Sequence, residues 1–596
     1  AEDPQAVVSA RLQALARSRH RQLAELPIEG PLPAATVIIP DERAAHALRR
    51  ELLRLGHGRL LVGTRFVSSF TLARETLAAA GVEFAGGEED LRPLRLRALF
   101  ARKPRLGYFD PEQLHAMPGW DEALARTIAE MEAGGLTPED LLRSGHKRAA
   151  DVGTLWREID RSAGDSWSTA RVMLEAAGLL GSFRPVHGPV LAAVTGHETT
   201  VHAAFLRALP RCTLVVFGAR PLRDEHVARV GLLFGDEVAA ALRGAQAPPA
   251  GSTDRDRLAA SLFEPIEISM HAGRPATFDH SVSLEQHAGI EDEIEAAADW
   301  VAREIVEHRT PLEEIAVLLP GLDPLAGFLA DRLARLPWKD GTLPVHVAGG
   351  LPATGAAAGV RILAILRALR EFLPANLVAA LLPWLCLDGD QPHLSASDSV
   401  QLAFALGTVG GGVSNPRGAL EWKAHLAARG RRGGGGEAPR EEHRAERRRR
   451  ERLLRDIRAV RVSLEMLADL AGRVLDGEAL RDLLAPFRTF LTERVRLPVA
   501  GDVSVQAIFL DRLEVACKAG VVGDLRGDDA LGFMQAAIES LRLGTGRFGD
   551  PAVYVGTIVG AAPLPFRAVR ILGLAEGQFP SAEHRDPVLP RAPSGF

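Results

Sequence analysis

Short apolar runs alternate along this chain with longer stretches of helical periodicity, and this alternation limits the folds that it can adopt. A first group of runs lies at Ala35–Pro40, Arg59–Gly63, Val190–Thr195 and Thr213–Gly218, and a second at Ser281–His287, Glu314–Pro320, Pro344–Ala348, Ala552–Val559 and Ala568–Leu574. Nearly continuous apolar runs of this length are typical of parallel strands that are covered on both faces. The sequence therefore predicts an α/β fold in which helices connect parallel strands by right-handed crossovers.

Two strand-poor blocks, at about 76–180 and about 373–550, interrupt the two groups of runs. A chain of 596 residues is long enough for several domains of about 100–200 residues each. We therefore expect two α/β domains, each with an inserted, mainly helical subdomain. The first domain comprises 1–75 and 181–280 around the insert at 76–180. The second comprises 281–372 and 551–596 around the insert at 373–550.

A glycine- and arginine-rich stretch at 429–450 stands out in the second insert. Its four consecutive glycines, Gly433–Gly436, predict a flexible loop. A helix is expected to follow, with an apolar face formed by Leu453, Leu454, Ile457, Val460, Leu464 and Leu467. Two interpretations of the run Arg447–Arg450 stay open: contact with a phosphate backbone, or a solvated start of the helix with acidic residues interleaved.

Lysine is scarce, and its positions exclude one common nucleotide-binding loop. The 71 basic residues include only five lysines, at Lys103, Lys147, Lys339, Lys423 and Lys518. None of them follows a glycine, so the chain lacks the GxxxxGK[ST] loop that holds nucleotide phosphates. A zincin-like stretch, His197 to His202, has its histidines five residues apart, and on a helix such residues point in different directions. We expect no catalytic residue and no metal site in this chain.

Charge and cysteine usage limit the compartment and the partners. The formal net charge is −5, which gives no overall basic field of the kind that purely electrostatic nucleic-acid binders carry. Cys212, Cys386 and Cys517 lie far apart and form neither a zinc spacing nor a disulfide framework, as expected in a reducing cytosol. The longest apolar stretch, Leu377–Leu387, is too short to span a bilayer. These features predict a cytoplasmic protein without membrane contact.

Four segments carry a resemblance to a known family. They are Thr36–Leu53 with Val62–Leu77, then Val190–Ala219, Ile315–Arg367 and Val553–Pro580. In this order they resemble the motifs of a superfamily I helicase of the UvrD/RecB type. More narrowly, they resemble AddB, the second subunit of AddAB-type helicase–nucleases, in an inactivated form. The last segment is the most specific, because its GLAEGQFP ending is similar to the GL-EG-FP block of the family. The resemblance implies two RecA-like domains.

The chain departs from the family at the positions that handle nucleotide and metal. Val194-Thr195-Gly196-His197 stands where active members carry the acids that hold Mg²⁺. In the last segment, Val559, Ala562 and Pro565 replace a histidine, a lysine and a glutamate of the family block. The resemblance therefore implies a fold that is kept while ATP hydrolysis is lost, and no cofactor is expected in this chain.

The resemblance also assigns candidate DNA contacts. Ser69 and Phe70 take the position of a Thr-Phe-like element that touches single-stranded DNA, and Thr557 keeps the frame of the last block. Phe70 is open to two interpretations, a base-stacking residue or a core residue. For contacts with phosphates we select Arg43, Arg65 and Arg567, which would make the affinity depend on salt.

The sequence thus favours an inactivated, helicase-like scaffold that binds single-stranded DNA or tailed duplex in double-strand-break repair. Its expected partner is a UvrD/AddA-type helicase–nuclease subunit. One alternative is part of an active ATP-dependent exodeoxyribonuclease subunit, with a nuclease domain carrying an iron–sulfur cluster beyond Phe596. Another is a protein-interaction scaffold without DNA contact.

Overall fold

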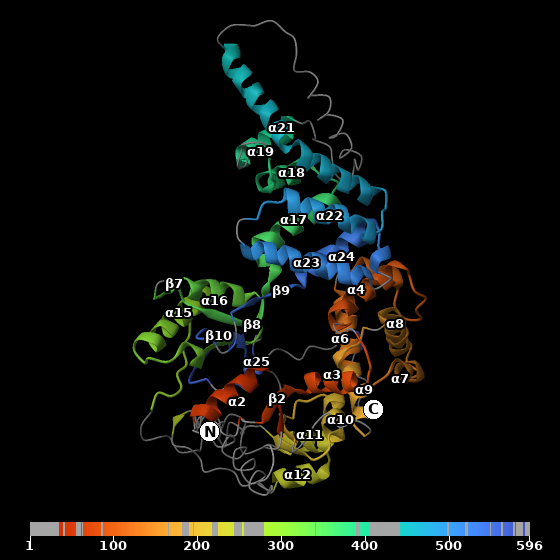
Figure 1. Cartoon of the computed structure of the whole chain (residues 1–596), viewed down its shortest axis with the longest axis vertical. Helices are drawn as coiled ribbons and strands as arrows, with labels where there is room; N and C mark the ends of the chain where they lie inside the picture. The colour runs from red at the N-terminus through yellow and green to blue at the C-terminus, as the bar shows by residue number, and fades with distance from the viewer. Residues whose placement is uncertain are drawn as a thin grey trace.

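The structure, a computed structural model, describes the residues at 35–39, 42–54, 61, 63–84, 88–117, 119–164, 166–181, 190–194, 196–216, 224–243, 253–254, 279–322, 324–339, 341–388, 394–405, 442–497, 500–518, 522–546, 548, 550–561, 564, 566–575, 579 and 588–589. Within them the chain is an α/β protein with two mainly parallel sheets and many helices (Figure 1). None of the described helices is both long enough and apolar enough to cross a membrane. The three cysteines are all free.

The first sheet has four parallel strands in the order β2-β1-β3-β4. The strands are β1 (Ala35–Ile39), β2 (Thr64–Ser68), β3 (Val190–Val194) and β4 (Cys212–Val216). Every residue of the central strand β1 is buried, as expected for an apolar run that is covered on both faces. The accompanying helices are α2 (Glu42–Arg54), α3 (Ser69–Ala79), α9 (Thr169–Leu179), α10 (Thr200–Ala208), α11 (Asp224–Phe234) and α12 (Asp236–Arg243). Helix α9 packs on α3 and α10, so it belongs with this sheet.

The second sheet has five strands in the order β11-β5-β10-β8-β9. They are β5 (Ile315–Leu319), β8 (Val345–Pro352), β9 (Arg542–Thr545), β10 (Val553–Thr557) and β11 (Ala568–Ile571). Helices α15 (Ile290–Val306) and α16 (Leu325–Ala334) pack against the buried residues of β5, and a short helix α25 (Ile558–Ala561) follows β10. A separate two-stranded hairpin pairs β6 (Pro337–Trp338) with β7 (Gly341–Thr342).

Seven of the nine predicted strands are confirmed, at β1, β3, β4, β5, β8, β10 and β11. Of the strand predicted at Arg59–Gly63, the structure describes only positions 61 and 63, and neither lies in a strand: β2 begins at Thr64, and Gly63 adopts a left-handed turn with φ 72° just before it. The strand predicted at Ser281–His287 is wrong. That segment is held beside β11 by side chains instead, because Arg570 Nη2 bonds Glu285 Oε2 at 2.6 Å and lies 3.2 Å from His287 Nε2.

One edge of the second sheet differs from the expected parallel pattern. Strand β9 lies in a region predicted to be helical, and it pairs with β8 in the antiparallel direction. Its run, Arg542–Thr545, is short and half polar, so it does not have the apolar signature of a buried strand. An antiparallel edge strand on a parallel sheet is a common arrangement. The remainder of the sheet is parallel.

The first helical block follows α3 in the chain. It contains α4 (Glu88–Ala101), α5 (Pro111–Ala116), α6 (Trp120–Ala133), α7 (Pro138–Arg143) and α8 (Lys147–Ala163). Its core includes Phe100, Leu124, Ile128 and Trp156. Val588, far along the chain, is also fully buried in this core and so links the end of the described chain to the block.

The second helical block lies between β8 and β9 and has the largest core. It contains α17 (Ala357–Arg370), α18 (Ala375–Leu381), α19 (Ala396–Ala405), α21 (Glu442–Leu475), α22 (Leu480–Arg494), α23 (Ala500–Lys518) and α24 (Gly527–Glu539). Helix α17 packs in this block, against α23 and α24. The charged end of the stretch, residues 442–450, is helical and opens α21, and 429–441, with the four glycines predicted as a loop, lies outside the described residues.

The predicted apolar face of α21 is confirmed where its side chains are described. Ile457, Val460, Leu464 and Leu467 are all buried in the core of the second block. Burying one such side chain fully contributes about 1.5–3 kcal/mol relative to exposure. Leu453 and Leu454, the first two predicted members of that face, have side chains outside the described set.

Candidate nucleic-acid interface

The two sheets meet across helix α2, and we refer to the buried apolar cluster between them as the seam. It consists of Val37, Ile39, Ala44, Ala45, Leu191, Ala316, Leu318, Ala348, Tyr554, Ala561, Leu564 and Phe566. The alanines of α2 allow its backbone to come close to the second sheet, because a small side chain fills little of the space between the elements. The seam therefore fixes how one sheet is placed against the other.

Arg43 and Tyr554 form the polar contact of the seam. Tyr554 on β10 is almost fully buried, and Arg43 Nη1 donates a hydrogen bond to its hydroxyl at 3.2 Å. The ring of Tyr554 folds over Gly556, where a Cβ atom would come within 2.5 Å of the ring. Glycine at this position is therefore what allows the tyrosine to lie flat in the seam. Arg43, selected from the sequence for a phosphate contact, takes part in the seam.

A pocket opens beside the seam, at the amino ends of the strands of the second sheet. Its walls are apolar, aromatic and charged, and they are formed by His46, Ala47, Arg50, Glu313, His346, Phe548, Asp550, Ala552, Tyr554, Leu564 and Phe566. Phe548 makes edge contacts with His46, His346 and Tyr554 at centroid distances of about 6 Å. His346 Nδ1 donates to the carbonyl of Thr545 at 2.9 Å. Ligands of open α/β sheets bind at the carboxyl ends of strands, so this pocket is at the opposite edge.

One face of α2 looks toward the second sheet, and sequence analysis missed its role. Arg43, His46, Ala47 and Arg50 have the i, i+3, i+4, i+7 spacing of a single helix face. The guanidinium of Arg50 lies 3.8 Å from a carboxylate oxygen of Glu313, just before β5. The spacing was visible in the sequence, but nothing there indicated that a second sheet would cover a face carrying two arginines.

The candidates at the end of β2 are engaged within the protein. Arg65 pairs with Glu75 of α3, with both side chains about two-fifths exposed. Ser69 is only 3% exposed, and its Oγ lies 2.6 Å from His202 Nε2. Phe70 is partly buried against the core of the first sheet. Of its two interpretations, the core residue is the one that this packing favours.

Thr557 and Arg567 lie at the two ends of the connection between β10 and β11. The Thr557 hydroxyl accepts a hydrogen bond from the backbone N–H of Gly560 at 3.0 Å, which caps the start of α25. Arg567 is exposed, and its backbone N–H bonds the carbonyl of Glu314 at 2.9 Å. Among the described residues the guanidinium of Arg567 has no hydrogen-bond or ion-pair partner. Of the three selected arginines, it is the one whose charge remains available to a ligand.

The carboxyl edge of the first sheet carries a cluster of histidines after β3. Gly196 adopts φ 79°, and a Cβ atom there would come within 2.7 Å of the His226 ring. Burial lowers the pKa of His202, against the opposing charge of Glu198. Burial, and then the charge of His197, lowers the pKa of His226. Both shifts favour the neutral imidazole. Among the described residues no group of histidine, cysteine or acidic side chains is arranged to hold a metal ion.

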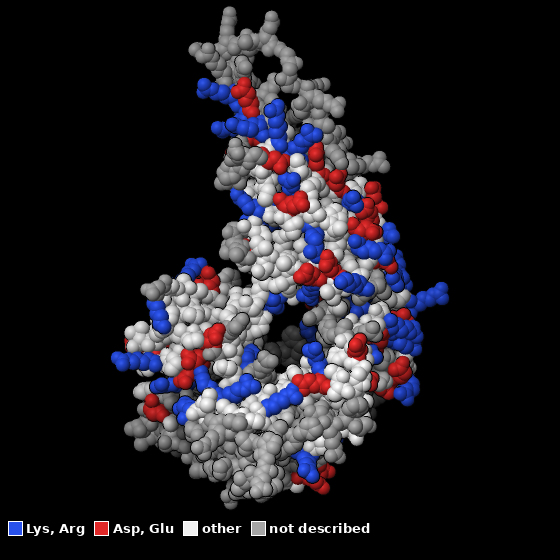
Figure 2. All heavy atoms as spheres, viewed as in Figure 1, with Lys and Arg blue, Asp and Glu red and all other residues white. Residues whose placement is uncertain are grey.

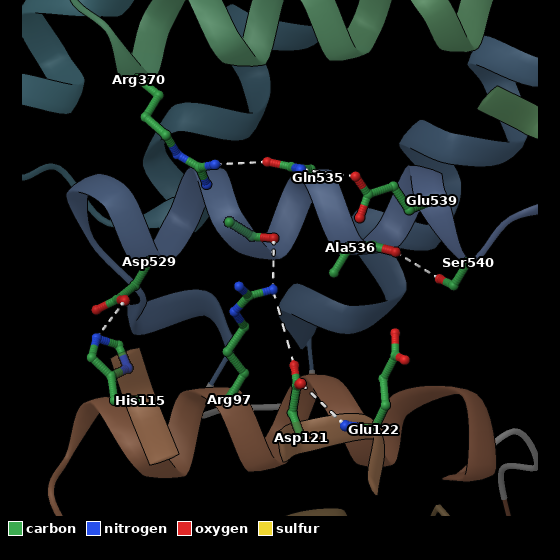
Figure 3. Close-up of polar contacts among 11 residues, drawn as sticks. Arg97, His115, Asp121, Glu122, Arg370, Asp529, Gln535, Ala536, Glu539 and Ser540 are labelled. Carbon is green, nitrogen blue, oxygen red and sulfur yellow. Dashed lines mark hydrogen bonds and ion pairs between the residues drawn. The ribbon is translucent and has the colours of Figure 1, made fainter. Parts of the chain in front are cut away.

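The two helical blocks touch through a polar contact that we refer to as the joint (Figure 3). Arg97 of α4 donates to the carbonyl of Gly532 in α24 at 3.3 Å, and His115 Nε2 lies 3.3 Å from an oxygen of Asp529. Arg370 of α17 secures α24 from the other side through Asp528 and Gln535, at 2.6 and 2.7 Å. Apolar contacts support the joint, because Leu94 and Ala98 of α4 are buried in the core of the second block.

Together, the seam and the joint close the molecule around a central hollow. The hollow lies between β8, β9 and α25 on one side and α4 and α6 on the other (Figures 1 and 2). Lys and Arg side chains gather along its rim in the space-filling view, although acidic residues also occur there. Compared with known protein families and with curated proteins, the sequence matches none.

Proposed function

We propose that this chain is a DNA-holding scaffold of the inactivated superfamily I helicase type. It guides a DNA strand through the central hollow for an active helicase–nuclease partner and does not hydrolyse ATP itself. The observation that carries this proposal is the arrangement of two mainly parallel sheets and two helical blocks around a hollow with a basic rim (Figure 2). A hollow of this kind suits a linear polymer, because basic groups on its rim can follow the phosphate backbone without reading bases.

The connection from β1 to α2 supports a role without nucleotide hydrolysis. Only two residues separate Ile39, the end of β1, from Glu42, the start of α2. The phosphate loop GxxxxGK[ST] needs about six residues before its lysine to wrap around the phosphates. In addition, Arg43 in the first turn of α2 is committed to Tyr554 in the seam. The connection between β1 and α2 is therefore too short for a phosphate loop, and it lacks the lysine that such a loop needs.

Two arginines near the seam are suited to phosphate contact in this proposal. Arg567 is exposed beside the start of β11. Arg49 is exposed on α2, with its guanidinium 4.8 Å from the ring centre of Phe66, an arrangement that holds a flexible side chain in place. An arginine held in this way loses less side-chain entropy when it binds a phosphate.

The test is binding of the purified chain to tailed duplex and to single-stranded DNA over a range of salt concentrations. We expect the logarithm of the affinity to fall linearly with the logarithm of salt, as phosphate contacts require. Arg49→Gln with Arg567→Gln should weaken binding and reduce the slope by about 1–2. Arg335→Gln with Arg367→Gln, which removes arginines paired with Asp331 and Glu371, is the matched control. Absence of DNA binding, or DNA-stimulated ATPase activity of the chain alone, would contradict the proposal.

A further inference from the structure

The long helix α21 carries a stripe of arginines on the part that extends from the second helical block. The helix spans 34 residues, and Figure 1 shows its first half projecting from the end of the molecule farthest from the sheets. Arg448, Arg452, Arg455 and Arg458 are all exposed on this half, and we refer to these four as the arginine stripe. Basic side chains also gather at this end of the molecule in Figure 2.

The charges of the arginine stripe are not neutralised within the described protein. None of the four forms an ion pair or hydrogen bond with another described side chain, whereas the next arginine, Arg461, bonds Glu465 at 2.8 Å. Glu451 is the exposed acidic side chain in the same stretch, and Asp456 is buried. Other surface arginines on helices of this chain do have an acidic partner three or four residues away, as Arg143, Arg161, Arg335 and Arg367 do.

The spacing of the stripe places its charges along one side of the helix. Arg448, Arg452 and Arg455 are separated by four and three residues and so share a face, with Arg458 beside them. From Arg448 to Arg458 the helix rises by about 15 Å. Duplex DNA carries one negative charge per about 1.7 Å of its axis, so a segment of this length presents about nine phosphate charges. A single strand carries half that density along the same axis.

The face has the chemistry of a polyanion contact and not of a protein contact. Protein interfaces have an apolar centre within a polar rim. The described residues of α21 include no exposed large apolar side chain. Arginine is also the residue that binds phosphate with paired hydrogen bonds. An anionic rod fits the stripe better than a folded partner does.

From these observations we propose that the arginine stripe of α21 binds the phosphate backbone of double-stranded DNA outside the central hollow. This inference rests on the proposed function, because it assigns a second, duplex-specific contact to a chain that holds a single strand elsewhere. The stripe positions the duplex and reads no bases, since its contacts are to phosphates. Because the stripe lies far from the sheets, the chain contacts a tailed duplex at two separate places, the stripe and the central hollow.

The test compares two variants with the same change in charge. In the first, Arg448, Arg452, Arg455 and Arg458 are each replaced by Gln, which has a good helix propensity. In the control, Arg143, Arg161, Arg335 and Arg367 are replaced by Gln; these four are exposed but paired with acidic residues. Circular dichroism verifies that both variants keep their helix content. Anisotropy with labelled tailed duplex and with the matching single strand then gives the slope of log affinity against log salt.

We expect the stripe variant to lose about 3–4 units of slope on tailed duplex, at about 0.9 per phosphate contact. The affinity of the stripe variant for the single strand should equal that of the parent chain. The control variant should bind both the tailed duplex and the single strand with the affinity of the parent chain. If the parent binds DNA and the stripe variant keeps the full duplex slope, the inference fails while the proposed function stands. Equal losses on duplex and single strand would overturn the duplex assignment. If the parent binds neither DNA, both proposals fail.

Discussion

Arg43 in the first turn of α2 donates a hydrogen bond from Nη1 to the hydroxyl of Tyr554 on β10, across 3.2 Å. This bond ties a helix of the first sheet to a buried strand of the second, although the two residues are 511 positions apart in the chain. A hydrogen bond between a charged donor and a buried hydroxyl contributes more than a neutral surface one, because the donor carries a charge and the hydroxyl is shielded from water.

Removing the Tyr554 hydroxyl should weaken the seam. We expect Tyr554→Phe to lower the free energy of unfolding by about 1–2 kcal/mol, because the ring stays packed while the Arg43 donor loses its acceptor. The matched control is Tyr108→Phe, since Tyr108 is the other tyrosine of the chain and is mostly exposed. Urea unfolding followed by tryptophan fluorescence measures both variants. Equal, small changes in the two would show that the hydroxyl adds nothing to the seam.

Gly556 should resist any side chain, because a Cβ atom would meet the Tyr554 ring at 2.5 Å. We expect Gly556→Ala to destabilise the chain by about 1–3 kcal/mol, as overpacking of a buried site does. In a background with Tyr554→Ala the clash is gone, so Gly556→Ala should cost clearly less there. A double-mutant cycle measures this coupling. Additive effects in the cycle would contradict the close packing of the two residues.

Asp160 gives the first helical block a dependence on pH. Burial, and then the charge of Glu132, raises the pKa of the Asp160 carboxyl to about 6, against the opposing charges of Arg92 and Arg171. The folded state therefore binds more protons than the unfolded state, where an aspartate titrates near about 3.9. Stability contributed by the protonated form is complete below about pH 4 and is lost as the pH rises through about 6.

Asp160→Asn should remove that dependence. Between about pH 4 and 6 the variant should gain about 2 kcal/mol of stability relative to the parent, with the difference constant at higher pH. Thermal unfolding over this range provides the measurement. Asp236→Asn, an exposed aspartate at the start of α12, is the control. Parallel pH curves for the parent and the Asp160 variant would rule out a raised pKa at this site.

The joint between the helical blocks should open when Gly532 acquires a branched side chain. A Cβ atom at Gly532 would lie 3.2 Å from Arg370 Nη2 and 3.6 Å from Arg97 Cζ, between the two guanidinium groups. We expect Gly532→Val to increase amide hydrogen exchange in α4 and α24 while β1 and β3 stay protected. Gly327→Val in α16 is the control, since nothing lies within 4 Å of a Cβ there. Unchanged exchange in α4 and α24 would mean that the joint tolerates the added bulk.

The candidate site was less predictable than the fold. Arg43, Arg65, Ser69, Phe70, Thr557 and Arg567 were selected because of the family resemblance and their positions near strand ends. In the structure, Arg43 bonds Tyr554, Arg65 pairs with Glu75, and Ser69 is buried against His202. Arg567 is exposed and makes no such contact with the part of the chain that the structure describes. Whether an arginine is available to a ligand depends on neighbours that are distant in sequence, and a local pattern does not contain them.

The sequence alone determined where buried strands and amphipathic helices form, because both follow from local apolar periodicity. Seven predicted strands and the described apolar face of α21 demonstrate this. The sequence also shows that no lysine follows a glycine, and this alone excludes the GxxxxGK[ST] phosphate loop. The tertiary structure decided that β9 joins the sheet as an antiparallel edge, that 281–287 is tethered by Arg570, and that Arg43 lies in the seam. These features depend on contacts between segments that are far apart in the chain. Such contacts become favourable only when the rest of the fold has brought the two segments together, so no local sequence pattern predicts them.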